Sequence, residues 1–136
     1  MKILVAYDGS EEAGRAVDWA GNLARELDGS KVSVISIAPT LEAAPRIADA
    51  VDPTSNLERH RTQAEEARAR LAKAGVTAEL IVRAGNPAEE ILNAVEDAFD
   101  VVVIGHRGIS SARRFLMGSV SERVVRHASR PVLVIP

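Results

Sequence analysis

The sequence predicts an α/β protein in which a five-stranded parallel β-sheet carries helices on both faces. Short apolar runs alternate with longer helical patterns along the chain, and this alternation is typical of a parallel sheet with helical crossovers. The run from Val101 to Ile104 contains no polar residue, as expected of a strand that is buried on both faces. The expected strands lie at residues 2–7, 32–37, 78–83, 101–104 and 131–135.

Local signals mark where the predicted helices begin and end. Ser10 precedes the first helical stripe, and Asn86-Pro87 precedes the third with an acidic residue in its first turn. Both patterns are typical of helix starts. Gly29 and Gly75 follow the first two stripes, where glycine commonly ends a helix. Residues 38–52 have no firm period, so we expect a loop there.

The composition limits the class of protein. The chain has 136 residues, which is the size of one domain by the usual ~100–200 residues, and we expect residues 1–136 to form it. Cysteine is absent, which excludes disulfides, thiolate metal sites and a cysteine nucleophile. No apolar run reaches the ~18 residues that a membrane helix needs, and the segment after Met1 lacks the flanks of a signal peptide. We therefore expect a cytoplasmic protein with no membrane partner.

The net charge of −2 hides an asymmetry within the chain. Residues 1–100 hold 11 Lys and Arg against 18 Asp and Glu, whereas residues 101–136 hold six Arg against one Glu. A basic segment beside an acidic remainder is expected if that segment holds an anionic ligand. The alternative is that Arg123, Arg126 and Arg130 only complement the dipole at the end of the last helix. Nucleic acid is not the expected anion, because aromatic residues for base stacking make up only 3% of the chain.

The stretch from Asp100 to Ser121 combines a strand, a glycine turn, a basic loop and a helix start. Gly105 ends the apolar run, Gly108 follows three residues later, and Gly118-Ser119 closes the loop. Ser119 and Glu122 have the spacing of a capping box, which predicts that the last helix begins at Ser119. A helix start directs unpaired N–H groups and partial positive charge outward. The order of these features predicts a phosphate-binding cradle.

The glycine spacing excludes two common phosphate-binding motifs and matches a third pattern. The chain contains neither G-x-G-x-x-G after a strand nor G-x-x-x-x-G-K-[ST]. It contains G-x2-G-x9-G-[ST], as Gly105, Gly108, Gly118 and Ser119, and this pattern resembles the ATP-binding branch of the universal stress protein family. The resemblance extends to Asp8-Gly9-Ser10, to the run GSVSERVVRHA and to the closing PVLVIP, so it covers essentially the whole chain.

The resemblance implies the Rossmann-like strand order 3-2-1-4-5. In that order the first and fourth strands are neighbours at the point where the winding of the chain reverses. Ligands of open α/β sheets bind in the crevice at such a point, beyond the carboxyl ends of the strands. Asp8 ends the first predicted strand and Gly105 ends the fourth. We therefore expect two distant motifs to meet at one site.

The resemblance implies ATP as the ligand of that site, with any Mg²⁺ carried by the phosphates and water. Asp8 offers a carboxylate to the adenine amino group or to the ribose, or else caps the first helix. Because aromatic residues are few, the adenine would lie between aliphatic side chains. Residues 118–121 would give N–H and hydroxyl donors to the outer phosphates. The residues expected to bind the nucleotide are Ala6 and Ile37 through their backbones, Asp8, Ile104, Gly105, Arg107, Gly108, Gly118, Ser119, Val120 and Ser121.

Side chains suited to catalysis or metal binding are few. His60 is expected to be solvated on a charged helix, His127 to interact with a helix dipole, and His106 to lie near the ligand. Neither a His-x-x-x-His pair nor a G-x-S-x-G elbow is present. Arg113 and Arg114 either close over the phosphates or remain solvated. We expect no catalytic residue, no protein metal site, and slow or no ATP hydrolysis, since no base is placed near the phosphates.

Three functions remain open from the sequence. The favoured one is an ATP-binding regulatory protein of the stress response that forms a homodimer. The dimer is expected through the apolar edge strand Val132, Leu133, Val134 and Ile135, and the resemblance points to the same strand. The alternatives are an adenine-nucleotide hydrolase or adenylating enzyme of a related fold group, and a nucleotide-free dimeric scaffold. That enzyme group often carries S-G-G-x-D-S after its first strand, whereas this chain has Tyr7-Asp8-Gly9-Ser10.

Overall fold

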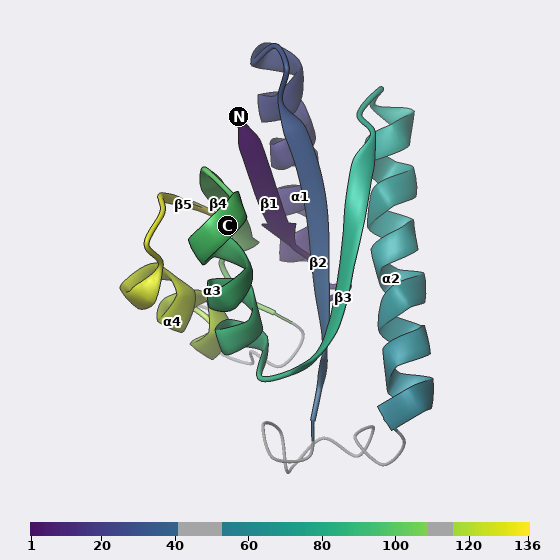
Figure 1. The fold of residues 1–136 in the computed structure, drawn as a ribbon, viewed down its shortest axis with the longest axis vertical. Coiled ribbons are helices and arrows are strands. Elements are labelled where there is room, and N and C mark those ends of the chain that lie inside the picture. The colour runs from purple at the N-terminus through teal and green to yellow at the C-terminus, as the bar shows by residue number, and fades with distance from the viewer. Residues whose placement is uncertain (41–52, 109–115) are drawn as a thin grey trace.

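The structure, a computed structural model, describes residues 1–40, 53–108 and 116–136. Strands and helices alternate along these residues (Figure 1). The strands are β1 (Lys2–Ala6), β2 (Lys31–Pro39), β3 (Ala78–Gly85), β4 (Val101–Gly105) and β5 (Val132–Ile135). The helices are α1 (Glu11–Glu26), α2 (Pro53–Lys73), α3 (Pro87–Ala98) and α4 (Ser119–His127). None of the helices in the described ranges is long and apolar enough to span a membrane.

All the described strands pair in parallel, in the order β3-β2-β1-β4-β5. The predicted parallel sheet and the implied strand order are thereby confirmed. β2 is longer than predicted, because it continues to Pro39 alongside Gly85 of β3. The remainder of the predicted loop, residues 41–52, lies outside the described residues.

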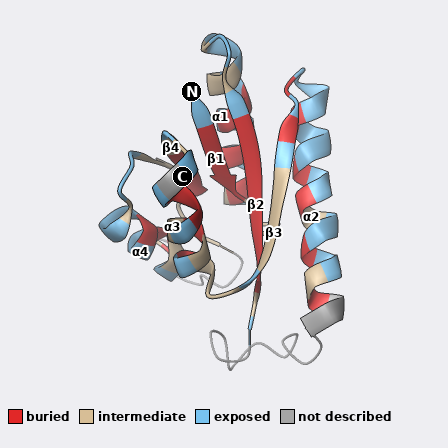
Figure 2. Cartoon of the chain, viewed as in Figure 1, coloured by how far each residue is buried: buried red, intermediate tan, exposed pale blue. Residues whose placement is uncertain are grey.

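Alternate side chains of β1 enter two separate cores on opposite faces of the sheet. Ile3 and Val5 pack with α1 and α2, whereas Leu4 and Ala6 pack with α3 and α4. All four residues are at most 8% exposed, and Figure 2 shows β1 and β2 as buried over most of their length. Burial on both faces explains why these strands lack polar alternation.

The predicted helix starts at Ser10 and Asn86 are confirmed by their hydrogen bonds. The Ser10 hydroxyl accepts from the Ala13 N–H at 3.1 Å, and the Asn86 side chain accepts from the Glu89 N–H at 3.2 Å. Gly29 follows α1 with a φ of +75°, a left-handed conformation that glycine adopts easily at the end of a helix.

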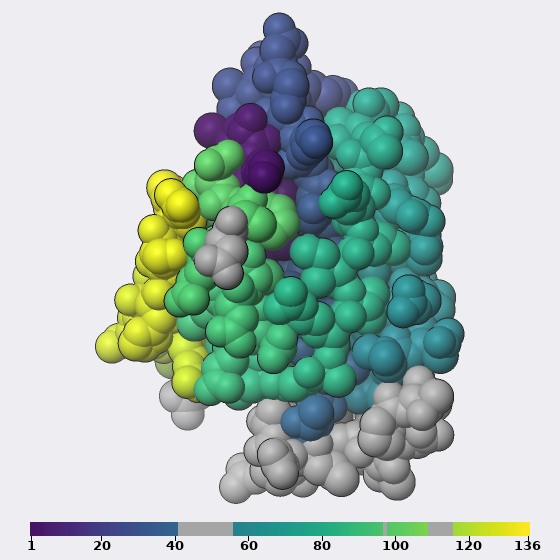
Figure 3. Space-filling model, in the orientation of Figure 1, coloured from purple at the N-terminus to yellow at the C-terminus, as the bar shows by residue number. Residues whose placement is uncertain are grey.

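The two edges of the sheet lie on opposite flanks of the molecule. Figure 3 shows α4 and β5 (yellow) along one flank, beside the green segment that contains β4 and α3. β5 is the last strand on that side, and β3 is the last strand on the other. Since all these strands run in the same direction, their carboxyl ends share one end of the sheet, and the helices α3 and α4 begin there.

Candidate functional site

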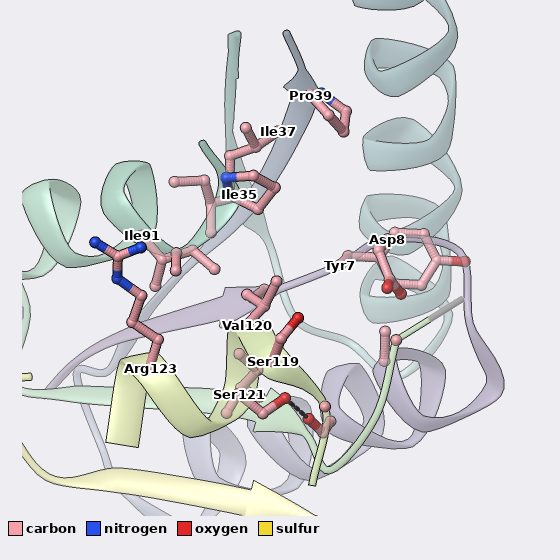
Figure 4. Close-up of a pocket in the computed structure, with 18 of the residues that line it drawn as sticks. Tyr7, Asp8, Ile35, Ile37, Pro39, Ile91, Ser119, Val120, Ser121 and Arg123 are labelled. Carbon is pink, nitrogen blue, oxygen red and sulfur yellow. Dashed lines mark hydrogen bonds between the residues drawn. The ribbon is translucent and has the colours of Figure 1, made fainter. Parts of the chain in front are cut away.

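A pocket of about 490 Å³ lies at the carboxyl ends of β1, β2 and β4. Its walls include the turns that follow β1 and β4 and the first turns of α3 and α4 (Figure 4). β1 and β4 are neighbours, but the helices that follow them cover opposite faces of the sheet. Open α/β sheets bind ligands at such a reversal. All eleven residues predicted to bind a nucleotide line this pocket, and their contacts with a ligand stay a prediction.

One part of the pocket is lined by aliphatic side chains. Figure 4 shows Ile35 and Ile37 of β2 gathered with Ile91 of α3 on one side. Ala6 and Ile104, at the ends of β1 and β4, belong to the same lining. Ile91, which is buried in the core on this face of the sheet, thus also lines the pocket. An aliphatic wall of this kind suits the planar face of an apolar ring.

Asp8 lies where the turn after β1 meets the turn after β4. Its Oδ1 accepts from the Ser10 N–H at 3.0 Å, so the carboxylate stabilises the turn ahead of α1. Its Oδ2 lies so close to Gly108 that a Cβ on that residue would collide with it. The N-cap of α1 is Ser10 and not Asp8, while the Asp8 carboxylate lines the pocket, and its contact with a ligand stays a prediction.

At two glycines of the motif, atoms of the protein leave little room for a side chain. A Cβ at Gly105 would lie 2.8 Å from the backbone carbonyl carbon of Glu12 in α1. The Gly118 N–H donates to the His106 carbonyl at 2.9 Å, and a Cβ at Gly118 would lie 3.3 Å from the Arg107 Cα. The glycines thus let the turn after β4 pack directly against α1 and against the start of α4.

The predicted capping box of Ser119 and Glu122 is wrong. Gly118 is the N-cap of α4 and makes no side-chain hydrogen bond. Its carbonyl accepts the Glu122 N–H at 2.9 Å, while the Glu122 carboxylate pairs with Arg126 at 2.9 Å. The helix therefore begins with Ser119 as its first residue. The N–H groups of residues 119–121 belong to the first helical turn, which leaves them without intrahelical partners.

The hydroxyl of Ser121 is engaged within the protein. It donates to the Gly105 carbonyl at 2.7 Å, as the dashed line in Figure 4 shows, and Ser121 is 3% exposed. The hydroxyl ties α4 to the end of β4, so the N–H of this residue remains the candidate donor to a phosphate. Ser119 is exposed and lines the pocket.

Arginines at the pocket are paired with carboxylates. Arg107 lies 3.2 Å from Glu12. The pKa of Glu12 is held below its usual range by its own backbone N–H and then by the Arg107 guanidinium. Arg123, which could have been only a dipole partner, lines the pocket and lies 3.0 Å from Glu89 of α3. The first ion pair joins the turn after β4 to α1, and the second joins α4 to α3.

Two of the three histidines do not line the described pocket. His127 is exposed in the last turn of α4, and its interaction with the helix dipole stays a prediction. His106 holds the turn through its backbone, since its N–H donates to the Ile135 carbonyl at 2.6 Å. Arg113 and Arg114 lie outside the described residues. Within the described ranges, no three His, Cys, Asp or Glu side chains group in a way that could hold a metal ion.

The prediction that His60 is solvated is wrong. His60 is 7% exposed, lines the pocket, and places its Nδ1 3.1 Å from the Ser36 Oγ of β2. The sequence contained a signal for the burial of His60. Asn56, His60 and Ala64 are spaced by four residues, which places them on one face of a helix, and all three are buried. Leu57, the neighbour of Asn56 in the sequence, is only half-buried.

The fold and the pocket define a class, the doubly wound α/β proteins with a ligand pocket at the switch point of the sheet. The model of the Universal stress protein family matches residues 1–136. The chain belongs to this family, which confirms the resemblance read from its motifs. Among the relatives, the Universal stress protein YxiE of Bacillus subtilis is 32% identical, and the match covers 98% of this chain and 97% of the relative.

Solved structures of similar proteins share this Rossmann-like fold. MJ0577 of Methanocaldococcus jannaschii matches with a TM-score of 0.83 and 27% identity over 98% of this chain and 94% of its own. A universal stress protein from Archaeoglobus fulgidus in complex with dAMP matches with a TM-score of 0.75 and 26% identity over 100% and 98%. Another universal stress protein, in complex with cAMP, matches with a TM-score of 0.69 and 27% identity over 100% and 97%.

Proposed function

We propose that the protein binds ATP in this pocket and acts as a nucleotide-sensitive regulatory protein of the stress response. The observation that carries the proposal is one continuous pocket that runs from an aliphatic wall to a glycine turn and a helix start. A nucleotide requires both environments, an apolar one for its base and N–H donors for its phosphates. The dAMP and cAMP complexes of similar proteins support an adenine nucleotide as the ligand.

In the proposed complex, the adenine lies against the side chains of Ile37 and Ile104. Asp8 accepts a hydrogen bond from the adenine amino group or from a ribose hydroxyl. The ribose and the first phosphate follow the turn from Gly105 to Gly108, and the outer phosphates reach the N–H groups at the start of α4. A Mg²⁺ ion would arrive with ATP and be held by phosphate and water oxygens.

We infer that ATP hydrolysis is slow or absent. Fast hydrolysis needs a group that orients or deprotonates the attacking water, but Glu12 is paired with Arg107, and Glu122 with Arg126. Asp8 lies at the proposed nucleoside end. Phosphate release under excess ATP and Mg²⁺ is expected far below the enzyme median of ~10 per second. Turnover near that rate would instead support an adenine-nucleotide hydrolase.

We also propose a homodimer joined through β5. This strand forms the edge of the sheet and pairs with β4 on its inner side. Val132, Leu133 and Val134 pack partly against the two cores, so the second copy would meet the outer backbone edge of the strand. Sedimentation is expected to show a dimer at micromolar concentration, and a monomer both with and without ATP would rule it out.

A charge introduced at the start of α4 tests the proposed phosphate site. Ser119→Glu places a carboxylate at a helix N-terminus, where it favours the helix but repels phosphate. We expect ATP affinity, measured by titration calorimetry, to fall at least about tenfold, or about 1.4 kcal/mol, while adenosine affinity changes little. Ser129→Glu adds the same charge at an exposed position beyond α4 and should leave ATP affinity unchanged. Equal ATP affinities in the two variants would contradict the phosphate site.

A further inference from the structure

A polar face of α2 meets the carboxyl end of β2 beside the proposed nucleotide site. The Asn56 Nδ2 donates to the Pro39 carbonyl at 3.2 Å, and the His60 Nδ1 lies 3.1 Å from the Ser36 Oγ. Ser36 is 0% exposed, Asn56 4% and His60 7%. Apolar side chains could fill this space without the cost of burying polar groups. Packing alone therefore does not account for an imidazole at this position.

The Ser36 hydroxyl determines which ring nitrogen of His60 carries the proton. In the part of the chain that the structure describes, the His60 ring is the hydrogen-bond partner of this hydroxyl. A buried O–H that donates to nothing is costly, so the Ser36 O–H donates to Nδ1. Nδ1 is then an acceptor, and the proton of the neutral ring is on Nε2.

The surroundings keep the His60 ring neutral near pH 7. Burial, followed by the positive charge of Arg59, holds the pKa of His60 below its usual value, while Asp8 acts in the opposite direction. A neutral ring has one directed N–H donor and no net charge. Because Nδ1 faces β2 and the ring lines the pocket, the Nε2–H is the polar group that the ring can offer to a ligand.

Resting on the proposed function, we propose that His60 is a base-specificity residue whose Nε2–H donates a hydrogen bond to a ring nitrogen of the bound purine. The ring lines the pocket from the α2 side, where its Nδ1 lies 3.1 Å from the Ser36 Oγ of β2. The proposed phosphate donors lie at the other side, at the start of α4. Unprotonated purine ring nitrogens are acceptors that match a neutral N–H donor. Ser36 is the positioning residue that fixes the ring.

Two substitutions separate the two ring nitrogens of His60. In His60→Asn the shorter amide reaches the position of Nδ1, so the Ser36 contact is kept and the donor to the ligand is lost. In His60→Gln the longer amide places an N–H near the position of Nε2. We expect ATP affinity to fall about tenfold in His60→Asn and less in His60→Gln. His127→Asn, at the exposed end of α4, is the matched control and should bind ATP as the wild type does.

ATP analogues with carbon in place of one ring nitrogen identify the accepting atom. We expect the wild type to bind one of 1-deaza-, 3-deaza- and 7-deaza-ATP about tenfold more weakly than ATP, because the His60 donor is left unpaired. His60→Asn should bind that analogue and ATP equally. The ring nitrogen NMR signals of His60, one of three histidines, should shift when ATP is added. Ser36→Ala should change the tautomer of the ring in the same spectra.

Failure of this inference and failure of the proposed function give different results. If the wild type binds no ATP, the proposed function is wrong, and this inference falls with it. If the wild type binds ATP but His60→Asn matches it for ATP and for all three analogues, His60 is a packing residue and this inference alone is wrong. If His60→Asn does not fold, the wild-type data decide. An absent analogue effect or an unshifted His60 signal would then overturn the proposal.

Discussion

The two sides of the pocket are built from different chemical groups. On the glycine side, the turn after β4 presents backbone groups, and backbone atoms of Glu12 and Arg107 leave little room for a Cβ at Gly105 and Gly118. On the α2 side, a helix presents side chains, and the His60 ring lies within hydrogen-bond distance of the Ser36 hydroxyl. The glycine side therefore depends on the packing of the fold. The α2 side can change its chemistry through single substitutions, which makes it the place where ligand choice can vary.

The largest effect is expected from one methyl group on the glycine side. A Cβ at Gly105 would lie 2.8 Å from the Glu12 carbonyl carbon and 2.9 Å from the Ala13 nitrogen, so the backbone of α1 would have to move. We expect Gly105→Ala to lower the free energy of unfolding by about 3 kcal/mol, measured by urea denaturation.

The matched control for this variant is Gly21→Ala in α1. A Cβ at Gly21 would meet a terminal methyl group of Leu71 at 3.0 Å, and that side chain can adjust. Alanine also favours the helix by about 0.5–1 kcal/mol relative to glycine. We expect a net change below about 1 kcal/mol. Equal losses of stability in the two variants would show that Gly105 is not fixed by backbone packing.

The sequence predicted the elements whose signals are local. The helix starts at Ser10 and Asn86 depend on hydrogen bonds between residues three positions apart, and such bonds follow from residue type and spacing. The apolar runs likewise predicted a buried parallel sheet. The strand order is not local information, and it came from the resemblance of the motifs to the family.

The site was less predictable where tertiary contacts decide the outcome. The spacing of Ser119 and Glu122 is a capping signal, but the hydrogen bond between Gly118 and His106 places the N-cap one residue earlier. The burial of His60 depends on facing Ser36 of β2, a partner 24 positions away. Helical period alone could place His60 on the inner face, but it could not supply that partner or the pocket.

A smaller effect is expected on the α2 side, as a dependence of stability on pH. Burial lowers the pKa of His60 in the folded protein, whereas the unfolded chain titrates near its ordinary value of about 6.5. Below that value the unfolded state binds a proton that the folded state does not. The free energy of unfolding therefore falls as the pH is lowered toward the folded pKa.

Urea denaturation at several pH values checks this prediction. Carboxylates also titrate under acid conditions, so the informative quantity is the difference between the wild type and His60→Gln. We expect the wild type to lose more stability than His60→Gln when the pH falls from about 7.5 to about 5.5. Identical pH dependence in the two proteins would contradict the buried neutral imidazole.

The central claim, that this pocket binds ATP through the glycine turn and the start of α4, is tested most directly by titration calorimetry of the wild-type protein with ATP. The proposal predicts one ATP per chain, with affinity weakened in Ser119→Glu and retained in Ser129→Glu. Absence of binding up to about 1 mM ATP, equivalent to a binding free energy weaker than about −4 kcal/mol, would contradict it.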